Sequence, residues 1–134
     1  MRESAWSTGL GKASQQAIEL VRRAIKLLAQ IEDDLLAIES SLFSRRLEND
    51  LAELARVLEM LVDAGFDAAV AYAEKAKLLA RYAAAVRNRM EALHSMRGLS
   101  RVRDEIMGHI GEIRLYLDGV EKGLSSSLAR GLHG

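Results

Sequence analysis

The amino-acid sequence predicts an all-α protein: a helical bundle made of one long antiparallel helical hairpin with additional shorter C-terminal helices. The 134 residues include no proline, 49% are apolar and only 4% are aromatic. Alanine, leucine, glutamate, lysine and arginine are abundant, and these residues favour helix, whereas strand formers are few. A chain of this length has room for one domain and one modest core.

The hairpin turn is predicted at Ala64-Gly65-Phe66-Asp67. Glycine adopts the left-handed conformation that ends many helices, and aspartate is a common cap of the helix that follows. The segments on both sides have the apolar periodicity of helices. The apolar rows are Ile18, Ile25, Leu36, Phe43, Leu47, Leu54 and Leu61 before the turn, and Tyr72, Ala76, Leu79, Ala83, Val86, Met90 and Leu93 after it.

Charged residues form blocks that support this hairpin. Residues 31–67 contain ten acidic and three basic residues, whereas residues 74–103 contain eight basic and two acidic residues. A fold at Gly65 brings the two blocks side by side, and such exposed pairs select register more than they add stability. The expected pairs are Glu53 with Lys77, Glu48 and Asp50 with Arg81, Glu39 with Arg89, and Asp33 and Asp34 with Arg97.

An alternative divides the first helix at Glu39-Ser40-Ser41-Leu42-Phe43-Ser44. A continuous helix of about 45 residues would be about 65–70 Å long, which is long for a compact domain. Serine hydroxyls compete with the helix backbone for hydrogen bonds. This second interpretation gives a four-helix bundle instead of the long hairpin.

A third helix is predicted after the Arg97-Gly98-Leu99-Ser100 stop signal. Its apolar row is Val102, Ile106, Ile110 or Ile113, and Leu117. Its four glycines at positions 108, 111, 119 and 123 each cost a helix about 1 kcal/mol relative to alanine. They indicate either close packing against the hairpin or a segment able to detach. The chain from Ser125 is expected to fray.

The predicted organisation is a flexible segment over residues 1–13, a core over 14–120 and a short tail over 121–134. Cysteine is absent, the formal net charge is zero, and no apolar run has the roughly 20 residues of a membrane span. We therefore expect a cytoplasmic protein, peripheral to a membrane if it meets one, without cofactor or metal and without nucleic acid as a partner. Glu91-x-x-His94 is only half of a di-iron signature.

The long helix, the turn with Gly65 and Asp67, and the following Asp67-Ala-Ala-Val-Ala-Tyr-Ala-Glu segment resemble the core of ESCRT-III proteins, most closely the archaeal cell-division branch. The resemblance covers roughly residues 14–120. It implies a filament subunit for membrane remodelling that polymerises with itself or related subunits and is removed by an AAA-type ATPase. The residues that resemble an ATPase-recruiting helix are Leu124, Leu128 and Leu132.

A membrane contact is also predicted from the residues themselves. Trp6 is the only tryptophan and stands near Leu10 and several basic residues, as in interfacial anchors. Trp6 can instead pack as a staple against a nearby helix. The candidate membrane-binding residues are Trp6, Leu10, Lys12, Arg22, Arg23, Lys77 and Arg81.

We expect no enzymatic activity, but one catalytic alternative stays open. Arg87 and His94 are seven residues apart, so they share a helix face, where arginine can bind phosphate and histidine can transfer a proton. Arg87-Asn88 followed by His94 resembles the signature of HEPN-type helical-bundle ribonucleases. The other interpretation is a border histidine beside a structural arginine.

Overall fold

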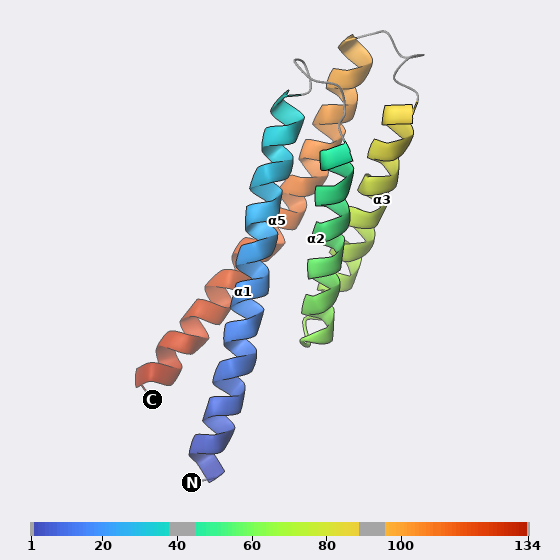
Figure 1. The fold of residues 1–134 in the computed structure, drawn as a ribbon. Helices are drawn as coiled ribbons and strands as arrows, with labels where there is room; N and C mark the ends of the chain where they lie inside the picture. The colour runs from blue at the N-terminus through green and yellow to red at the C-terminus, as the bar shows by residue number, and fades with distance from the viewer. Residues whose placement is uncertain (1, 38–44, 89–95, 134) are drawn as a thin grey trace.

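The computed structural model describes residues 2–37, 45–88 and 96–133, and these residues form four helices without a strand. The helices are α1 (Arg2–Leu36), α2 (Arg45–Asp63), α3 (Ala69–Asn88) and α5 (Met96–His133). They run alternately up and down, so the protein is an all-α helical bundle of antiparallel neighbours (Figure 1). The fold class predicted from the sequence is confirmed.

The predicted long first helix is wrong, and the four-helix alternative is the observed arrangement. α1 ends at Leu36, and α2 begins at Arg45 and returns beside α1. The Arg46 Nε atom lies 3.5 Å from Asp34 Oδ1, which shows that the two helix ends lie side by side. Leu36 is 63% exposed although its spacing predicted burial. The predicted break at residues 39–44 lies outside the described residues.

The turn between α2 and α3 is confirmed and forms a Schellman motif. Gly65 has a φ of +104°, Phe66 N–H donates to Leu61 O at 3.0 Å, and Gly65 N–H donates to Val62 O at 3.0 Å. Phe66 packs against the core, which adds the apolar contact typical of this motif. The Asp67 backbone carbonyl accepts from Val70 N–H at 3.1 Å, while no hydrogen bond joins its side chain to the described residues.

Replacing Gly65 with alanine is expected to lower the free energy of unfolding by about 1 kcal/mol, because a Cβ atom is unfavourable at positive φ. Gly123→Ala is the matched control. Gly123 lies in α5 with no neighbour within 4 Å of an added Cβ, so this change should raise stability by about 0.5–1 kcal/mol. Urea denaturation of both variants measures the effects, and equal shifts for the two would contradict the turn geometry.

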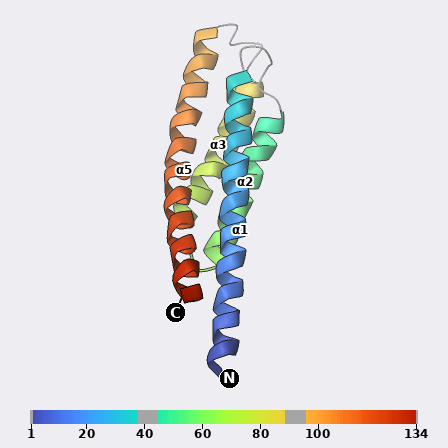
Figure 2. The same ribbon diagram turned by 90° about the vertical axis from the view of Figure 1, so that its left-hand side faces the viewer.

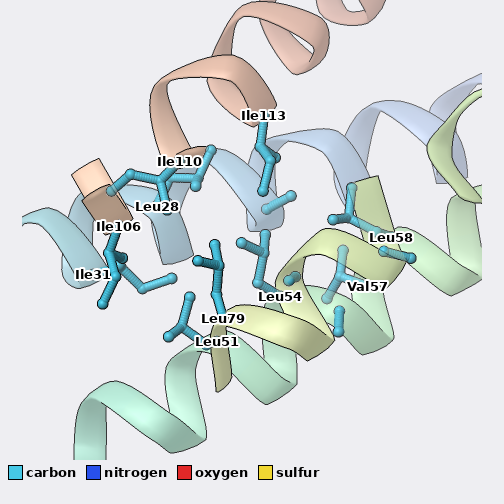
Figure 3. Close-up of a cluster of buried hydrophobic side chains, with 14 of the residues drawn as sticks. Leu28, Ile31, Leu51, Leu54, Val57, Leu58, Leu79, Ile106, Ile110 and Ile113 are labelled. Carbon is cyan, nitrogen blue, oxygen red and sulfur yellow. The ribbon is translucent and has the colours of Figure 1, made fainter. Parts of the chain in front are cut away.

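The core is a continuous apolar cluster contributed by all four helices (Figure 3). No polar or charged residue is buried among the residues whose side chains are described. The predicted row of α5 is confirmed, with both Ile110 and Ile113 buried. The largest fully buried side chains are Leu28, Ile31, Leu35, Leu47, Leu51, Leu54, Leu58, Leu61, Ile106, Ile110, Ile113 and Leu117.

The last helix differs from the prediction in its length and in its glycines. α5 has 38 residues and is the longest described helix, beginning before Ser100 and continuing past Ser125 to His133. An added Cβ would meet nothing within 4 Å at Gly108, Gly111, Gly119 or Gly123. The glycines therefore do not permit close packing against the hairpin, and that interpretation is wrong.

The observed ion pairs also correct the predicted register of the hairpin. Lys77 pairs with Glu59 instead of Glu53, and Glu48 pairs with Arg87 instead of Arg81. The turn occupies residues 64–68, so the chain reverses beyond Gly65, and Glu48 and Glu59 meet α3 in a register shifted from the predicted one. Glu53 and Asp50 pair with Arg23 and Arg46 instead. Asp34 pairs with Arg46, while the expected partners at positions 39, 89 and 97 lie outside the residues with described side chains.

Candidate interaction surfaces

The two long helices extend beyond the α2–α3 turn and form a separate end of the molecule (Figures 1 and 2). A shallow groove of about 460 Å³ joins the end of α2 at Met60 and Asp63 to Gln16 and Leu20 of α1. Tyr72, near the start of α3, stacks on Tyr116 of α5 with ring centroids 4.4 Å apart. Residues 2–15 of α1 and 121–133 of α5 therefore run past the four-helix part, and we call them the terminal extension.

The terminal extension contains several of the predicted membrane and partner residues. The backbone of Trp6, Leu10 and Lys12 belongs to α1, and that of Leu128 and Leu132 belongs to α5, but their side chains lie outside the described set. Predicted segments 1–13 and 121–134 are thus helical in their described parts. The extension has four basic residues (Arg2, Lys12, Lys122, Arg130) and two acidic ones (Glu3, Glu121).

Most of the predicted membrane-binding basic residues are engaged within the chain. Arg22 Nε lies 3.7 Å from Glu121 Oε2, and Arg23 pairs with Glu53 of α2. Lys77 pairs with Glu59 and Glu74, and the hydrogen bond to Glu59 is the main cause of its raised pKa. These contacts are exposed, so each adds little stability and can exchange with an external anion.

Arg81 is exposed and lines a second shallow groove, of about 300 Å³. The groove runs between α2 and α3, and its other lining residues are Ala52, Ala55, Arg56, Glu59, Lys77 and Ala80. The predicted residues therefore do not converge on one patch. Lys77 and Arg81 lie on the α2–α3 hairpin, whereas Arg22 and Arg23 lie on α1 near the extension.

The Arg87 side chain is bound by a carboxylate. Its Nε atom donates to Glu48 Oε2, and its second nitrogen lies 3.4 Å from Glu48 Oε1, in a partly buried contact between α2 and α3. The Glu48 carboxylate neutralises the charge of the Arg87 guanidinium, so a phosphate would have to compete with Glu48 for it. His94 lies outside the described residues, so the pairing of Arg87 with His94 stays a prediction.

Two carboxylates between α1 and α2 form a polar contact that the sequence analysis missed. The Asp34 and Asp50 side chains are 13% and 17% exposed, and Arg46 Nε lies within 4 Å of both. One oxygen of each, Asp34 Oδ2 and Asp50 Oδ2, is buried without a hydrogen-bond partner. Burial and the neighbouring Asp34 carboxylate raise the pKa of Asp50 to about 6.

The described residues contain no group of three or more histidine or acidic side chains positioned to hold a metal ion. None of the described helices is apolar over a sufficient length to cross a membrane. Large apolar side chains are nevertheless exposed on each of the four described helices. They are Leu36, Met60, Val70, Leu78, Tyr82 and Leu115.

Comparison of this chain with protein-family models, curated proteins and solved structures finds no match.

Proposed function

We propose that this protein acts by association, as a helical subunit that assembles with copies of itself or related subunits at a membrane surface, in the manner of ESCRT-III proteins. The observation that carries the proposal is the terminal extension. In the four-helix part, α2 and α3 cover the inner faces of α1 and α5, and beyond the turn these two helices have no such cover (Figure 1). A two-helix end with apolar residues favours a further partner.

The composition of the extension suits a membrane interface. Trp6 and Leu10 provide apolar area, and the excess of basic residues attracts anionic lipid. Leu20, Val120 and Leu124 are only partly buried where the extension joins the bundle. The proposed contact is thus made by this end of the molecule, together with Arg22 and Arg23 of α1 where the extension joins the bundle.

Recruitment of an AAA-type ATPase is a further part of the proposal. Leu124 packs against the core, and the ion pair between Arg22 and Glu121 holds α5 to α1 at the same level. An ATPase that binds Leu124, Leu128 and Leu132 as one helical face would compete with these contacts. Binding would therefore separate the end of α5 from α1 and loosen the subunit.

Co-sedimentation with anionic vesicles across a salt series tests the membrane contact. We expect the wild type to pellet at low salt, with Trp6→Ala lowering the partition coefficient by about tenfold. The double variant Arg22→Ala/Arg23→Ala should lower the partition coefficient by a similar factor. Each basic residue near the surface contributes about 1 kcal/mol to binding, and part of this is offset because Arg22 and Arg23 must first break their ion pairs with Glu121 and Glu53.

Two matched controls separate a local contact from general effects. Leu36→Ala removes exposed apolar area from the opposite end of α1, and Arg45→Ala/Arg101→Ala removes the same charge from exposed sites at the opposite end of the bundle. Both controls should bind vesicles as the wild type does. Equal losses in the controls and the test variants, or no vesicle binding by the wild type at low salt, would contradict the proposed contact.

A further inference from the structure

The outer face of α5 carries a continuous row of exposed residues at coiled-coil spacing. The row is Asp104, Gly108, Gly111, Leu115, Asp118 and Lys122, and we call it the α5 outer row. Its steps alternate between four and three residues, the spacing that keeps side chains on one seam of paired helices. Every member is exposed, and Leu115 is 76% exposed, the highest value among the large apolar side chains that the structure describes.

The position of the α5 outer row follows from the contacts of its neighbours. Arg114 and Glu121 pair with Glu32 and Arg22 of α1, and on the other side Glu105, Glu112 and Tyr116 contact Tyr82, Lys75 and Tyr72 of α3. The α5 outer row lies between these two sets and about half a turn from the buried side chains of α5. In Figure 2, α5 forms one side of the bundle with no helix outside it.

Two features of the α5 outer row have no use within one chain. Gly108 and Gly111 weaken α5 by about 1 kcal/mol each, and nothing lies within 4 Å of where their Cβ atoms would be. Leu115 projects from the same face without cover. A second helix lying on this face would use both features, because glycines admit a close approach and an apolar side chain fills the space above them.

The α5 outer row is complementary to itself when two copies run antiparallel about residue 113. Leu115 of each copy then lies over Gly111 of the other, and Asp104 of each lies level with Lys122 of the other. This register places an apolar side chain above a glycine twice and joins opposite charges twice. A parallel arrangement places Asp104 beside Asp104 and Leu115 beside Leu115, so it offers neither match.

The residues that flank the α5 outer row do not oppose this register. The Glu112 carboxylate is paired with Lys75, which lowers the pKa of Glu112, and Arg114 Nη1 lies 2.6 Å from Glu32 Oε1. These flanking charges are thus neutralised within each chain. Asp104 is 73% exposed, with Arg103 Nε 3.5 Å from its Oδ1 atom, and Lys122 is exposed. An exposed pair of this kind is weak, so Asp104 can exchange it for Lys122 of a partner.

We infer that the α5 outer row is the contact through which two copies of this chain form an antiparallel, two-fold symmetric dimer. The inference deepens the self-association part of the proposed function and does not depend on membrane contact. A single helix seam buries less than the roughly 1,600 Å² of a standard interface, so the dimer is weak and forms at high chain concentration. It gives the assembly a defined two-subunit unit in which only Lys122 belongs to both the seam and the terminal extension.

Sedimentation velocity of the full chain without lipid, over a concentration series, tests the dimer. Gly111→Ala places a methyl group where Leu115 of the partner lies, so it should weaken dimerisation at least tenfold while stabilising the fold. Gly123→Ala adds the same methyl group to the same helix about a quarter turn away from the α5 outer row and should dimerise as the wild type does. A dimer unchanged by Gly111→Ala, or a wild type monomeric at every concentration, would overturn the inference.

Charge exchange gives an independent test of the register. Asp104→Lys and Lys122→Asp should each weaken the dimer. The double variant should form the dimer again, and this dimer should dissociate at high salt. Failure of the double variant to recover would overturn the antiparallel register. Vesicle binding is measured separately, so a monomer that still binds vesicles refutes this dimer alone, and a dimer that binds no vesicles refutes only the membrane contact.

Discussion

Replacing Leu54 with alanine is expected to lower the free energy of unfolding by about 2–5 kcal/mol, the range for leucine removal from a packed core. Leu54 is fully buried in α2 and lies in the cluster with Leu51 and Leu58, facing residues of the other helices (Figure 3). The loss combines the transfer of a large apolar side chain with a cavity that rigid helices cannot close. Urea denaturation followed by circular dichroism at the helix band measures it.

Leu78→Ala provides the matched control for this prediction. Leu78 is 61% exposed on α3, so the same change there should alter stability by less than about 0.5 kcal/mol. Similar losses for the two variants would mean that the helices do not pack in the arrangement described here.

The free energy of unfolding is expected to fall by about 2 kcal/mol as the pH rises through about 6, because of the contact between Asp34 and Asp50. The folded state keeps a proton on Asp50 with a pKa of about 6, whereas the ordinary value is 3.8, so the folded state binds more protons between these values. The contribution is complete below about pH 4 and is lost above about pH 6. Partial solvent access reduces its size.

Asp50→Asn removes the ionisable group and should remove this part of the pH dependence. Asparagine keeps the size of the side chain and can donate to the Asp34 carboxylate, so the variant should be more stable than the wild type near pH 7.5. Asp33→Asn changes an exposed aspartate on α1 and serves as the control. Denaturation curves over a pH series measure the difference, and a slope unchanged in Asp50→Asn would refute the role of this pair.

Features that depend on local sequence were predicted correctly. The Schellman turn needs glycine at one position and an apolar residue after it, and Gly65 and Phe66 satisfy both conditions. The buried row of α5 from Val102 to Leu117 follows from helical periodicity, which tertiary packing did not change. The all-α class follows from composition in the same way.

Features that depend on how helices meet could not be predicted in the same way. Leu36 and Phe43 are seven residues apart, a spacing equally compatible with one continuous helix or with two helices, so periodicity did not reveal the end of α1. The ion-pair register depended on the length of the turn after Gly65. Asp34 and Asp50 are sixteen positions apart, and only the return of α2 beside α1 brings them together.

The residues proposed for membrane contact were chosen from charge and aromatic content, which do not indicate the partners of a side chain. Arg22 and Arg23 pair with Glu121 and Glu53 because α1 lies between α2 and α5. The α5 outer row could not be predicted from its glycines, because the sequence does not show that nothing in the described chain packs against them. Its alternating spacing is visible in the sequence, but its exposure is known only once α1 and α3 are placed beside α5.

We propose that this protein acts by assembling at a membrane surface. Negative-stain electron microscopy of the wild-type chain with anionic vesicles at low salt tests it most directly. We expect protein assemblies on the vesicle surface that are lost at high salt and reduced by Trp6→Ala. Bare vesicles beside dispersed single bundles, under conditions in which the chain is folded, would contradict the claim.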